Sequence, residues 1–299
     1  MLKRSIALLA VMILTLTSLF GCAKPKHPDY QEDKPVSVMS FNVLNGYGNN
    51  GDFSDPAIRE KWVVQIVKEH SPDLIGFQET SNVSISWRED LHADLCENGE
   101  YDHKDLEEEE NFMLSSMTTG AGLMIFWKAD RFEFVESGCY EYTYFSSQVR
   151  YYQWVKLHDK IYDKDIVMTN THLSINSDSY DADGEGGMQL RKDEGQELYD
   201  FWKANVTKDT VLFATGDYNA RDGEPIHEVL QTDGTFMPSC DIAYAYDGRT
   251  SIDFVYTSPA TVEVDEVQTL IYDFRDQMED QTKDDTYYRA SDQIGRAHV

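Results

Sequence analysis

Apolar residues recur along the chain in two patterns, and these predict a series of strands and helices. Residues 36–44, 73–77 and 210–215 are short runs rich in apolar and β-branched side chains, which is typical of buried strands. Residues 54–70 begin with Ser-Asp-Pro and then place apolar side chains three and four positions apart, which predicts a helix with one buried face. The chain therefore has the elements of a mixed α and β fold.

The remaining elements follow from the same two patterns. We expect helices at 87–96, 188–206 and 226–230, a hairpin within 121–135 that turns at 128–130, and strands at 149–157, 165–171, 251–256 and 261–270. Strands dominate, so we expect two packed sheets with helices outside them. The chain has no internal repeat and no interior linker, so we expect one domain over residues 36–292.

Polar side chains follow several of these predicted strands at the point where each strand ends. Asp217 and Asn219 end the strand at 210–215, and the alternation of side chains along a strand points both to the same side. Asn42 and Glu79 end two other strands. A carboxylate and a carboxamide side by side suit the task of holding a water or a hard cation against a phosphate. The alternative is a strand that ends in an ordinary Asx turn.

The N-terminus predicts export and a lipid anchor. Two basic residues precede an apolar run at residues 6–20, which is short for a membrane span, and Leu-Phe-Gly-Cys22 resembles a bacterial lipobox. We expect residues 1–21 to be a lipoprotein signal peptide, Cys22 to be lipidated, and residues 22–35 to be a tether. The protein would then lie on the extracytoplasmic face of the cell membrane. The alternative is a plain secretory signal with a chance Cys.

Composition indicates a packed globular protein, and its charge restricts the partners. The 299 residues are 41% hydrophobic and 12% aromatic, which is ample for a core. Two of the 26 basic residues and none of the 54 acidic ones lie in residues 1–21, so the remaining chain carries a net charge of −30. No basic cluster offsets this charge, and binding to nucleic acid in general depends on Lys and Arg. Long nucleic acid is therefore a disfavoured partner.

Six short motifs, taken together, resemble a known family. They are SFNVL at 40–44, QET at 78–80, NTHL at 170–173, GDYN at 216–219, SIDFVY at 251–256 and SD at 291–292. Each motif is weak alone, but the six occur in order over the whole expected domain. The chain resembles the endonuclease/exonuclease/phosphatase superfamily, which includes deoxyribonucleases, sphingomyelinases and inositol 5-phosphatases. The resemblance implies a four-layer α/β (α+β) sandwich, in which two packed mixed sheets are flanked by helices.

The resemblance also implies roles for the residues at the strand ends. Glu79 would be the main Mg²⁺ ligand with Asn42 nearby, and Mn²⁺ could replace Mg²⁺. Asp217 would orient or deprotonate the attacking water, and Asn219 would hold that water or a phosphate oxygen. His172 would contact the phosphate and the leaving group. A metal held in this way neutralises the charge that spreads over the phosphoryl oxygens.

The end of the chain departs from the family. Asp253 would orient a second His that normally follows the Ser-Asp pair at Asp292, but Gln293 stands at that position. One reverse translation of residues 293–299 looks like the start of a common sequencing adapter, so we expect a non-native tail. We then expect the chain to lack both the family's last strand and this imidazole. The alternative is that these residues are native and have diverged, with His298 in place of the lost His. However, His298 lies five residues beyond position 293, and five extended residues would carry its ring about 16 Å from the family's position.

The sequence thus predicts an exported, membrane-anchored, metal-dependent phosphohydrolase that cleaves a phosphodiester or a phosphomonoester. A small or membrane-presented substrate fits the charge better than long duplex DNA. Two alternatives within the fold are an extracellular nuclease and a catalytically impaired binding module. A third alternative is an acidic protein that only binds calcium. The acidic run at 181–186 does not support it, because Lys192 stands where a calcium loop needs a bidentate Glu.

Overall fold

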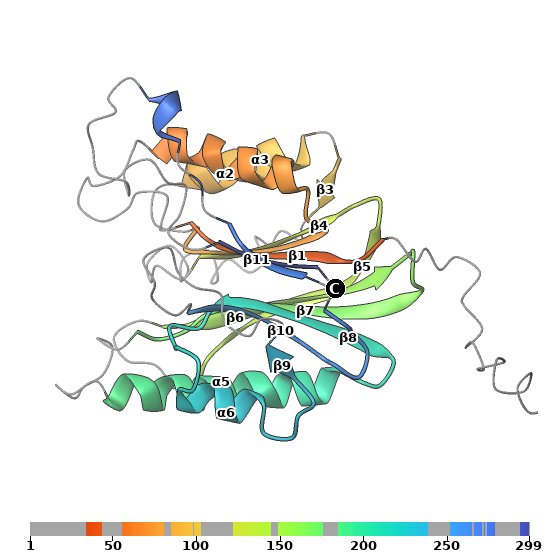
Figure 1. Cartoon of the computed structure of the whole chain (residues 1–299), viewed down its shortest axis with the longest axis vertical. Coiled ribbons are helices and arrows are strands. Elements are labelled where there is room, and N and C mark those ends of the chain that lie inside the picture. The colour runs from red at the N-terminus through yellow and green to blue at the C-terminus, as the bar shows by residue number, and fades with distance from the viewer. Residues whose placement is uncertain are drawn as a thin grey trace, which may run out of the picture. The chain divides into compact units, whose positions relative to one another are not determined.

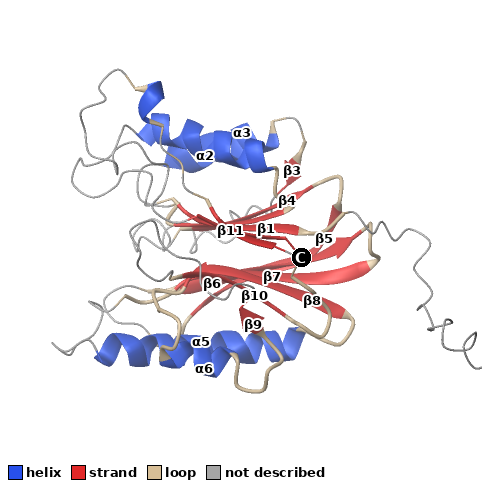
Figure 2. Cartoon of the chain, viewed as in Figure 1, coloured by secondary structure: helices blue, strands red, loops and turns tan. Residues whose placement is uncertain are grey.

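Two mixed β-sheets organise the fold, with helices on their outer faces (Figures 1 and 2). The computed structural model describes residues 34–43, 56–80, 85–97, 99–102, 122–144, 149–175, 185–238, 252–264, 266–270, 272, 274–278 and 294–298. The expected signal peptide, Cys22 and Asp292 lie outside these residues. Within the described residues, no helix is long and apolar enough to cross a membrane.

The first sheet has six strands in the order β11-β12-β1-β2-β4-β3. They are β1 (Ser37–Asn42), β2 (Leu74–Gln78), β3 (Tyr101–Asp102), β4 (Leu123–Lys128), β11 (Glu266–Thr269) and β12 (Ile294–His298). Strands β1 and β2 run parallel, and the other pairs run antiparallel. Helices α2 (Pro56–His70) and α3 (Ile85–Cys96) lie along the outer face of this sheet (Figure 1).

The second sheet also has six strands, in the order β5-β6-β7-β8-β10-β9. They are β5 (Phe132–Glu141), β6 (Tyr151–Asp159), β7 (Lys164–His172), β8 (Thr210–Asp217), β9 (Met237–Pro238) and β10 (Asp253–Thr257). Only β7 and β8 run parallel among the described pairs of this sheet. Helices α5 (Glu185–Asn205) and α6 (Pro225–Leu230) cover its outer face (Figure 1), and a 3₁₀ helix, η3 (Arg275–Gln277), follows β11.

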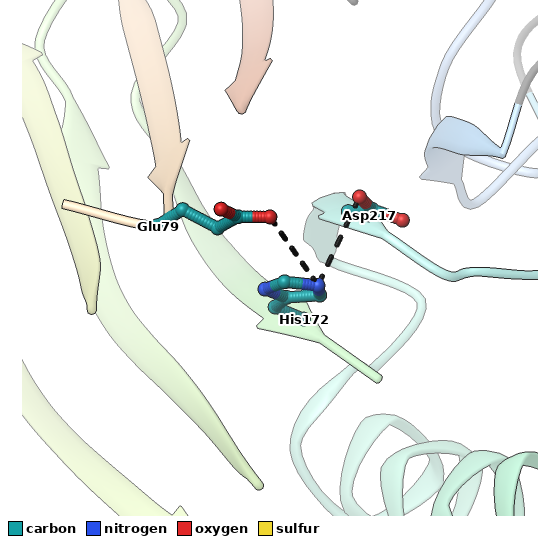
Figure 3. A group of neighbouring side chains, drawn as sticks. All are labelled: Glu79, His172 and Asp217. Atoms are coloured by element: carbon teal, nitrogen blue, oxygen red, sulfur yellow. Dashed lines mark ion pairs between the residues drawn. The ribbon is translucent and has the colours of Figure 1, made fainter. Parts of the chain in front are cut away.

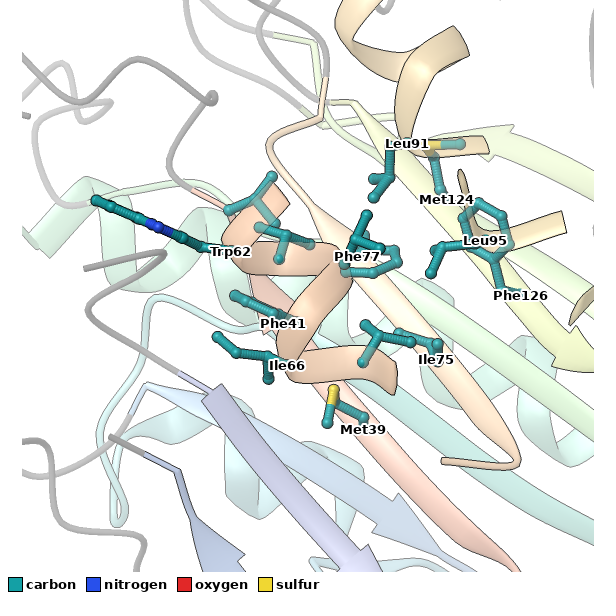
Figure 4. Packing of buried hydrophobic residues seen from close by; sticks show 14 of the residues in the cluster. Met39, Phe41, Trp62, Ile66, Ile75, Phe77, Leu91, Leu95, Met124 and Phe126 are labelled. Carbon is teal, nitrogen blue, oxygen red and sulfur yellow. The ribbon is translucent and has the colours of Figure 1, made fainter. Parts of the chain in front are cut away.

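Three apolar layers hold these elements together, which confirms the four-layer sandwich predicted from the sequence. Helices α2 and α3 bury Trp62, Ile66 and Leu91 against the first sheet (Figure 4). Helix α5 buries Leu198 and Trp202 against the second sheet. A third cluster, which includes residues of β1, β2 and β4 as well as β6, β7 and β8, fills the space between the sheets. The central strands β1, β2 and β8 therefore bury both faces, as their near-continuous apolar runs predict, whereas most of β5 is exposed.

The hairpin predicted within residues 121–135 is wrong. Its two strands exist as β4 and β5, but β4 pairs with β2 and β5 pairs with β6, so the chain crosses from one sheet to the other at the turn. Arg131 anchors this crossing, because its guanidinium lies 2.9 Å from Asp159 and 3.2 Å from Asp73 and also donates to the Pro35 carbonyl. The buried guanidinium thus bridges the two sheets where a hairpin would have kept both strands in one.

The strand predicted at 261–270 is shorter than expected. The amides of Thr261 and Val262 both donate to the Ser258 carbonyl, so the chain turns there. Among the residues of this range that the structure describes, only Glu266–Thr269 form a strand. Pro259 follows Ser258 and fits this turn, since proline favours such positions.

The strand expected to be missing at the end of the chain is present. Residues Ile294–His298 form β12, which lies between β11 and β1 and pairs antiparallel with both. The origin of residues 293–299 is not tested by this pairing and stays a prediction. The register places His298 opposite Ser37 and Ile294 opposite Phe41. The backbone of His298 therefore lies at the end of β1 far from Asn42, so the register does not bring residue 298 to the strand ends where Asn42 stands.

Candidate functional site

Four of the predicted site residues meet at one end of the space between the sheets. Asn42 ends β1 and Glu79 directly follows β2, so both come from the first sheet. His172 ends β7 and Asp217 ends β8, and these two residues are opposite each other in the parallel register of the second sheet. The polar side chains at these four strand ends therefore lie together.

Glu79, His172 and Asp217 form a group that could hold a metal ion. One ligand atom of each lies within 4.8 Å of the other two. Figure 3 shows Nε2 of His172 facing both carboxylates, at 3.9 Å from Oε1 of Glu79 and 3.9 Å from Oδ2 of Asp217. Oxygen ligands from one or two carboxylates suit Mg²⁺ and Mn²⁺, and neutral imidazole is a common ligand of transition metals. The group fits a divalent cation held between the two sheets.

Asn42 orients both carboxylates. Its amide nitrogen donates to Oε1 of Glu79 and to Oδ2 of Asp217, each at 2.9 Å. The same nitrogen therefore joins the ends of the two sheets, and both acceptor oxygens are the ones that face His172. In this arrangement Asn42 presents its nitrogen to the carboxylates, so it positions the metal group from beside it.

His172 is a neutral imidazole at pH 7. Burial lowers its pKa well below the ordinary value of 6.5, and the nearby charge of Arg150 lowers the pKa further. Arg150 is itself buried, at 2% exposure, and immediately precedes β6. A neutral imidazole can accept a proton or bind a cation through its free nitrogen. Arg150 is not among the residues predicted for the site, yet its charge acts on His172.

The backbone is strained at two of the predicted site residues. Glu79 has φ of 59° and Asn219 has φ of 48°, so both lie in the left-handed region that side chains other than glycine rarely adopt. The strain at Asn219 closes a tight turn in which its amide donates to Oδ1 of Asp217 at 2.9 Å. Such strain persists only where the surrounding structure enforces it, and it is common at functional sites.

The segment after His172 is fixed from both sides. The Leu173 amide donates to the Asp217 carbonyl at 3.0 Å, and the Leu173 carbonyl accepts from the Asn219 side chain at 2.9 Å. Ser174 donates through its amide and its hydroxyl to Glu194 of α5. Burial raises the pKa of Glu194 to about 7, while its hydrogen bonds to Ser174 oppose that rise. Helix α5 thus holds the chain next to the predicted catalytic His.

Asp253 lies next to the site because its strand, β10, pairs with β8. It is 6% exposed and lies opposite Asp217 in the antiparallel register of β10 and β8. Residues opposite each other in such a pair share one face, so the two carboxylates are neighbours. Asp292 lies outside the described residues, and its predicted role stays a prediction.

Sequence reasoning missed a group of buried polar residues directly behind the site. Gln78, Asn170 and Thr215 are each 0% exposed and lie between the sheets. Two of them could have been predicted from the alternation of side chains along a strand. Asn170 precedes His172 by two positions and Thr215 precedes Asp217 by two, so each shares a face with a predicted site residue.

The chain matches the sequence model of the Endonuclease/Exonuclease/phosphatase family over residues 39–292. A comparison with curated proteins found no match. The match to the family model extends over all four residues that meet at the strand ends, and it ends at Asp292.

Similar solved structures cover nearly the whole chain at low sequence identity. An endonuclease/exonuclease/phosphatase family protein from Bacteroides thetaiotaomicron has a TM-score of 0.67 at 18% identity and covers 90% of this chain and 98% of its own. The mannosyl-6-phosphatase Bt3783 of Bacteroides thetaiotaomicron VPI-5482 has a TM-score of 0.65 at 18% identity, with 88% and 99% covered. The D. rerio TDP2 in complex with a single-strand DNA product has a TM-score of 0.60 at 15% identity, with 89% and 98% covered. At these identities the likeness establishes the fold.

Proposed function

This chain belongs to the endonuclease/exonuclease/phosphatase family, and from that premise we propose that it is an exported, metal-dependent phosphohydrolase. The observation that carries the proposal is the convergence of Glu79, His172 and Asp217, whose ligand atoms lie within 4.8 Å of one another at the edge of the two sheets. Membership of the family supports hydrolysis of a phosphoester bond. We also propose that this hydrolysis depends on Mg²⁺ or Mn²⁺.

Glu79, Asp217 and His172 would hold the cation, with Asn42 orienting the two carboxylates. The cation would neutralise charge on the phosphoryl oxygens and act as a Lewis acid. Asp217 is a buried carboxylate whose Oδ1 already accepts from the Asn219 amide, so its direction is fixed. Such a carboxylate can orient a water molecule and accept its proton. His172 is a neutral imidazole with a single lone pair, so where it binds the cation it does not also accept a proton, although its N–H can still donate to a phosphate oxygen.

A small or membrane-presented phosphoester is the proposed substrate class. The chain carries a net charge of −28, and a surface of this charge repels long polyanions. The similar mannosyl-6-phosphatase acts on a small phosphomonoester by its name, whereas the similar TDP2 structure contains single-strand DNA. The charge of this chain favours the first of these two substrate classes. A phosphodiester of a lipid head group meets the same requirement.

The test measures hydrolysis of p-nitrophenyl phosphate, bis-p-nitrophenyl phosphate and duplex DNA with Mg²⁺, Mn²⁺ or EDTA. We expect turnover of one of the small esters, loss of that turnover in EDTA, and weak cleavage of DNA at physiological salt. Glu79→Gln should abolish turnover, and Glu133→Gln, on the exposed part of β5, is the matched control. Full turnover in EDTA would contradict the metal assignment. No turnover of any ester would favour the impaired binding module.

We also propose that Cys22 carries a lipid that holds the domain at the outer face of the cell membrane. The support is the signal-like run at residues 6–20 followed by Leu-Phe-Gly-Cys22. Cys22→Ser should move the protein from the membrane fraction to the soluble fraction. Retention of the variant in the membrane fraction would contradict lipidation at this residue.

A further inference from the structure

Three buried polar side chains join the two sheets directly behind the candidate metal group. They are Gln78 of β2, Asn170 of β7 and Thr215 of β8, and each is 0% exposed. We refer to these three residues as the inter-sheet clamp. Buried polar groups cost free energy unless they are hydrogen-bonded, so their presence in an otherwise apolar layer needs a reason.

Asn170 is the centre of the inter-sheet clamp. Although its backbone belongs to the second sheet, its amide nitrogen donates to two carbonyls of the first sheet, Phe77 at 2.7 Å and Met124 at 3.2 Å. Its oxygen accepts from Nε2 of Gln78 at 2.6 Å and from Oγ1 of Thr215 at 3.1 Å. A carboxamide offers two donor hydrogens and two acceptor lone pairs, and all four are used here. No other side chain of this size could satisfy the same four partners.

Glycine at position 76 lets the sheets approach at this point. A Cβ atom on Gly76 would lie 2.0 Å from Oγ1 of Thr215 and 2.9 Å from Oδ1 of Asn170. Both distances are shorter than van der Waals contact allows, so any larger residue at position 76 would push the sheets apart. The inter-sheet clamp thus combines specific hydrogen bonds with a steric limit on the spacing of the two sheets.

The inter-sheet clamp lies next to the metal group on the same strands. Gln78 directly precedes Glu79, and the register pairs Asn170 with Thr215 just as it pairs His172 with Asp217. Residues two apart on a strand share a face, so the clamp and the metal group face the same layer. Glu79 comes from the first sheet while His172 and Asp217 come from the second, so their convergence depends on how far apart the sheets are.

We propose that the inter-sheet clamp positions the two halves of the metal group, with Asn170 as the main positioning residue. This inference rests on the proposed metal-dependent function. Loss of the clamp should change the separation between Glu79 and the pair formed by His172 and Asp217, and so weaken metal binding. A purely structural polar group would lower the thermal stability of the protein without a particular effect on metal affinity.

The chain offers a matched pair of variants that separates these two outcomes. Thr215→Val removes a hydroxyl from the inter-sheet clamp and keeps the shape of the side chain. Thr169→Val makes the same change in the neighbouring strand β7, but on the outer face of the second sheet. There, Oγ1 of Thr169 accepts a hydrogen bond from the Trp202 indole of α5 at 3.1 Å. Both threonines are buried, at 0% and 1% exposure. Asn170→Leu is the stronger variant, since it removes all four hydrogen bonds.

The experiment measures Mn²⁺ affinity by calorimetry, and melting temperature in EDTA, on the full chain purified in detergent. We expect Thr215→Val to weaken Mn²⁺ binding by about tenfold or more, as loss of groups behind a metal site generally does, while Thr169→Val leaves the affinity unchanged. Asn170→Leu should weaken it further, and if that variant does not fold, the threonine pair decides alone.

Equal Mn²⁺ affinity in wild type, Thr215→Val and Thr169→Val would overturn the positioning role and leave the proposed function standing. Equal loss of affinity in both threonine variants would also overturn it, since general destabilisation would then explain the effect. A wild-type protein that binds no Mn²⁺ would overturn the proposed metal site itself, and the inference with it. The wild-type measurement therefore separates failure of the inference from failure of the proposed function.

Discussion

The layer between the two sheets differs at its two ends, although the same strands line both. At one end, β7 and β8 contribute Met168 and Phe213 to an apolar cluster. Four positions further along each strand, and on the same face, stand His172 and Asp217. One pair of strands thus changes from apolar to polar within four residues.

The difference between the two ends separates stability from chemistry. Each fully buried large apolar side chain contributes about 1.5–3 kcal/mol, so the apolar end stabilises the packing of the sheets. Burying carboxylates costs free energy unless they are paired, so the polar end opposes folding and depends on its hydrogen bonds and on a cation. Changes at the polar end should therefore alter activity, and changes at the apolar end should alter stability.

The largest expected effect is on activity, from a change at the polar end of β8. Asp217→Asn keeps the shape of the side chain but removes its charge, so kcat/KM should fall by at least about a thousandfold. The free energy of unfolding should change little, because the loss of one of the two hydrogen bonds that Asp217 accepts offsets the removal of a buried carboxylate opposite Asp253. Steady-state kinetics and urea unfolding in EDTA measure the two quantities. A variant that keeps its kcat/KM would remove Asp217 from the mechanism.

The matching change at the apolar end of the same strand should have the opposite profile. Phe213→Ala removes a side chain that is 1% exposed between the sheets, and the cavity should lower the free energy of unfolding by about 3–5 kcal/mol. The folded fraction should keep a kcat/KM close to that of wild type at low temperature. A fall in kcat/KM as large as that of Asp217→Asn would show that the two ends are not separate.

The elements of both ends could be predicted from the sequence because their signals are local. The apolar runs of β1, β2 and β8 predict strands, and the polar residues at their ends predict the site. Partners that lie far apart in sequence could not be predicted. The turn after β4 resembles a hairpin, and only the distant pairing of β4 with β2 and of β5 with β6, together with the contacts of Arg131, shows that the chain changes sheets there. Asn170 belongs to a recognised motif, yet its partners in β2 and β4 carry no local signal.

The pH dependence of stability should also distinguish the ends, by a moderate amount. The pKa of His172 in the folded protein lies well below 6.5, so as pH falls below 6.5 the unfolded chain takes up a proton that the folded chain does not. In EDTA, this should lower the free energy of unfolding by up to about 1.4 kcal/mol per pH unit until the folded pKa is reached.

The control for this pH effect is His172→Gln, which cannot take up the proton. Urea unfolding of wild type and variant between pH 7.5 and pH 5 should give a difference in the free energy of unfolding that shrinks or reverses as pH falls. Met168→Leu, at the apolar end of the same strand, should follow the wild-type pH dependence. If His172→Gln loses stability with pH as steeply as wild type, burial does not lower the pKa of His172 in the way the structure indicates.

The smallest expected effect concerns backbone strain, which occurs at both ends of β2. Ser71 has φ of 45° just before the strand, and Glu79 has φ of 59° just after it. The left-handed conformation costs a side-chain-bearing residue roughly 1–2 kcal/mol and costs glycine little.

Ser71 also ends α2, where its amide donates to the Val67 carbonyl, and glycine is the preferred residue at such helix ends. Ser71→Gly loses two side-chain hydrogen bonds, one donated to the exposed Glu100 and one accepted from Lys128. The net gain in the free energy of unfolding should therefore be small, about 0.5 kcal/mol, with kcat/KM unchanged. Glu79→Gly relieves the same kind of strain but removes a metal ligand, so it should gain stability in EDTA and lose activity. If Ser71→Gly lowers stability, or if Glu79→Gly gains none, the two strained residues are not equivalent, and the strain at Glu79 is then held by contacts of its own side chain.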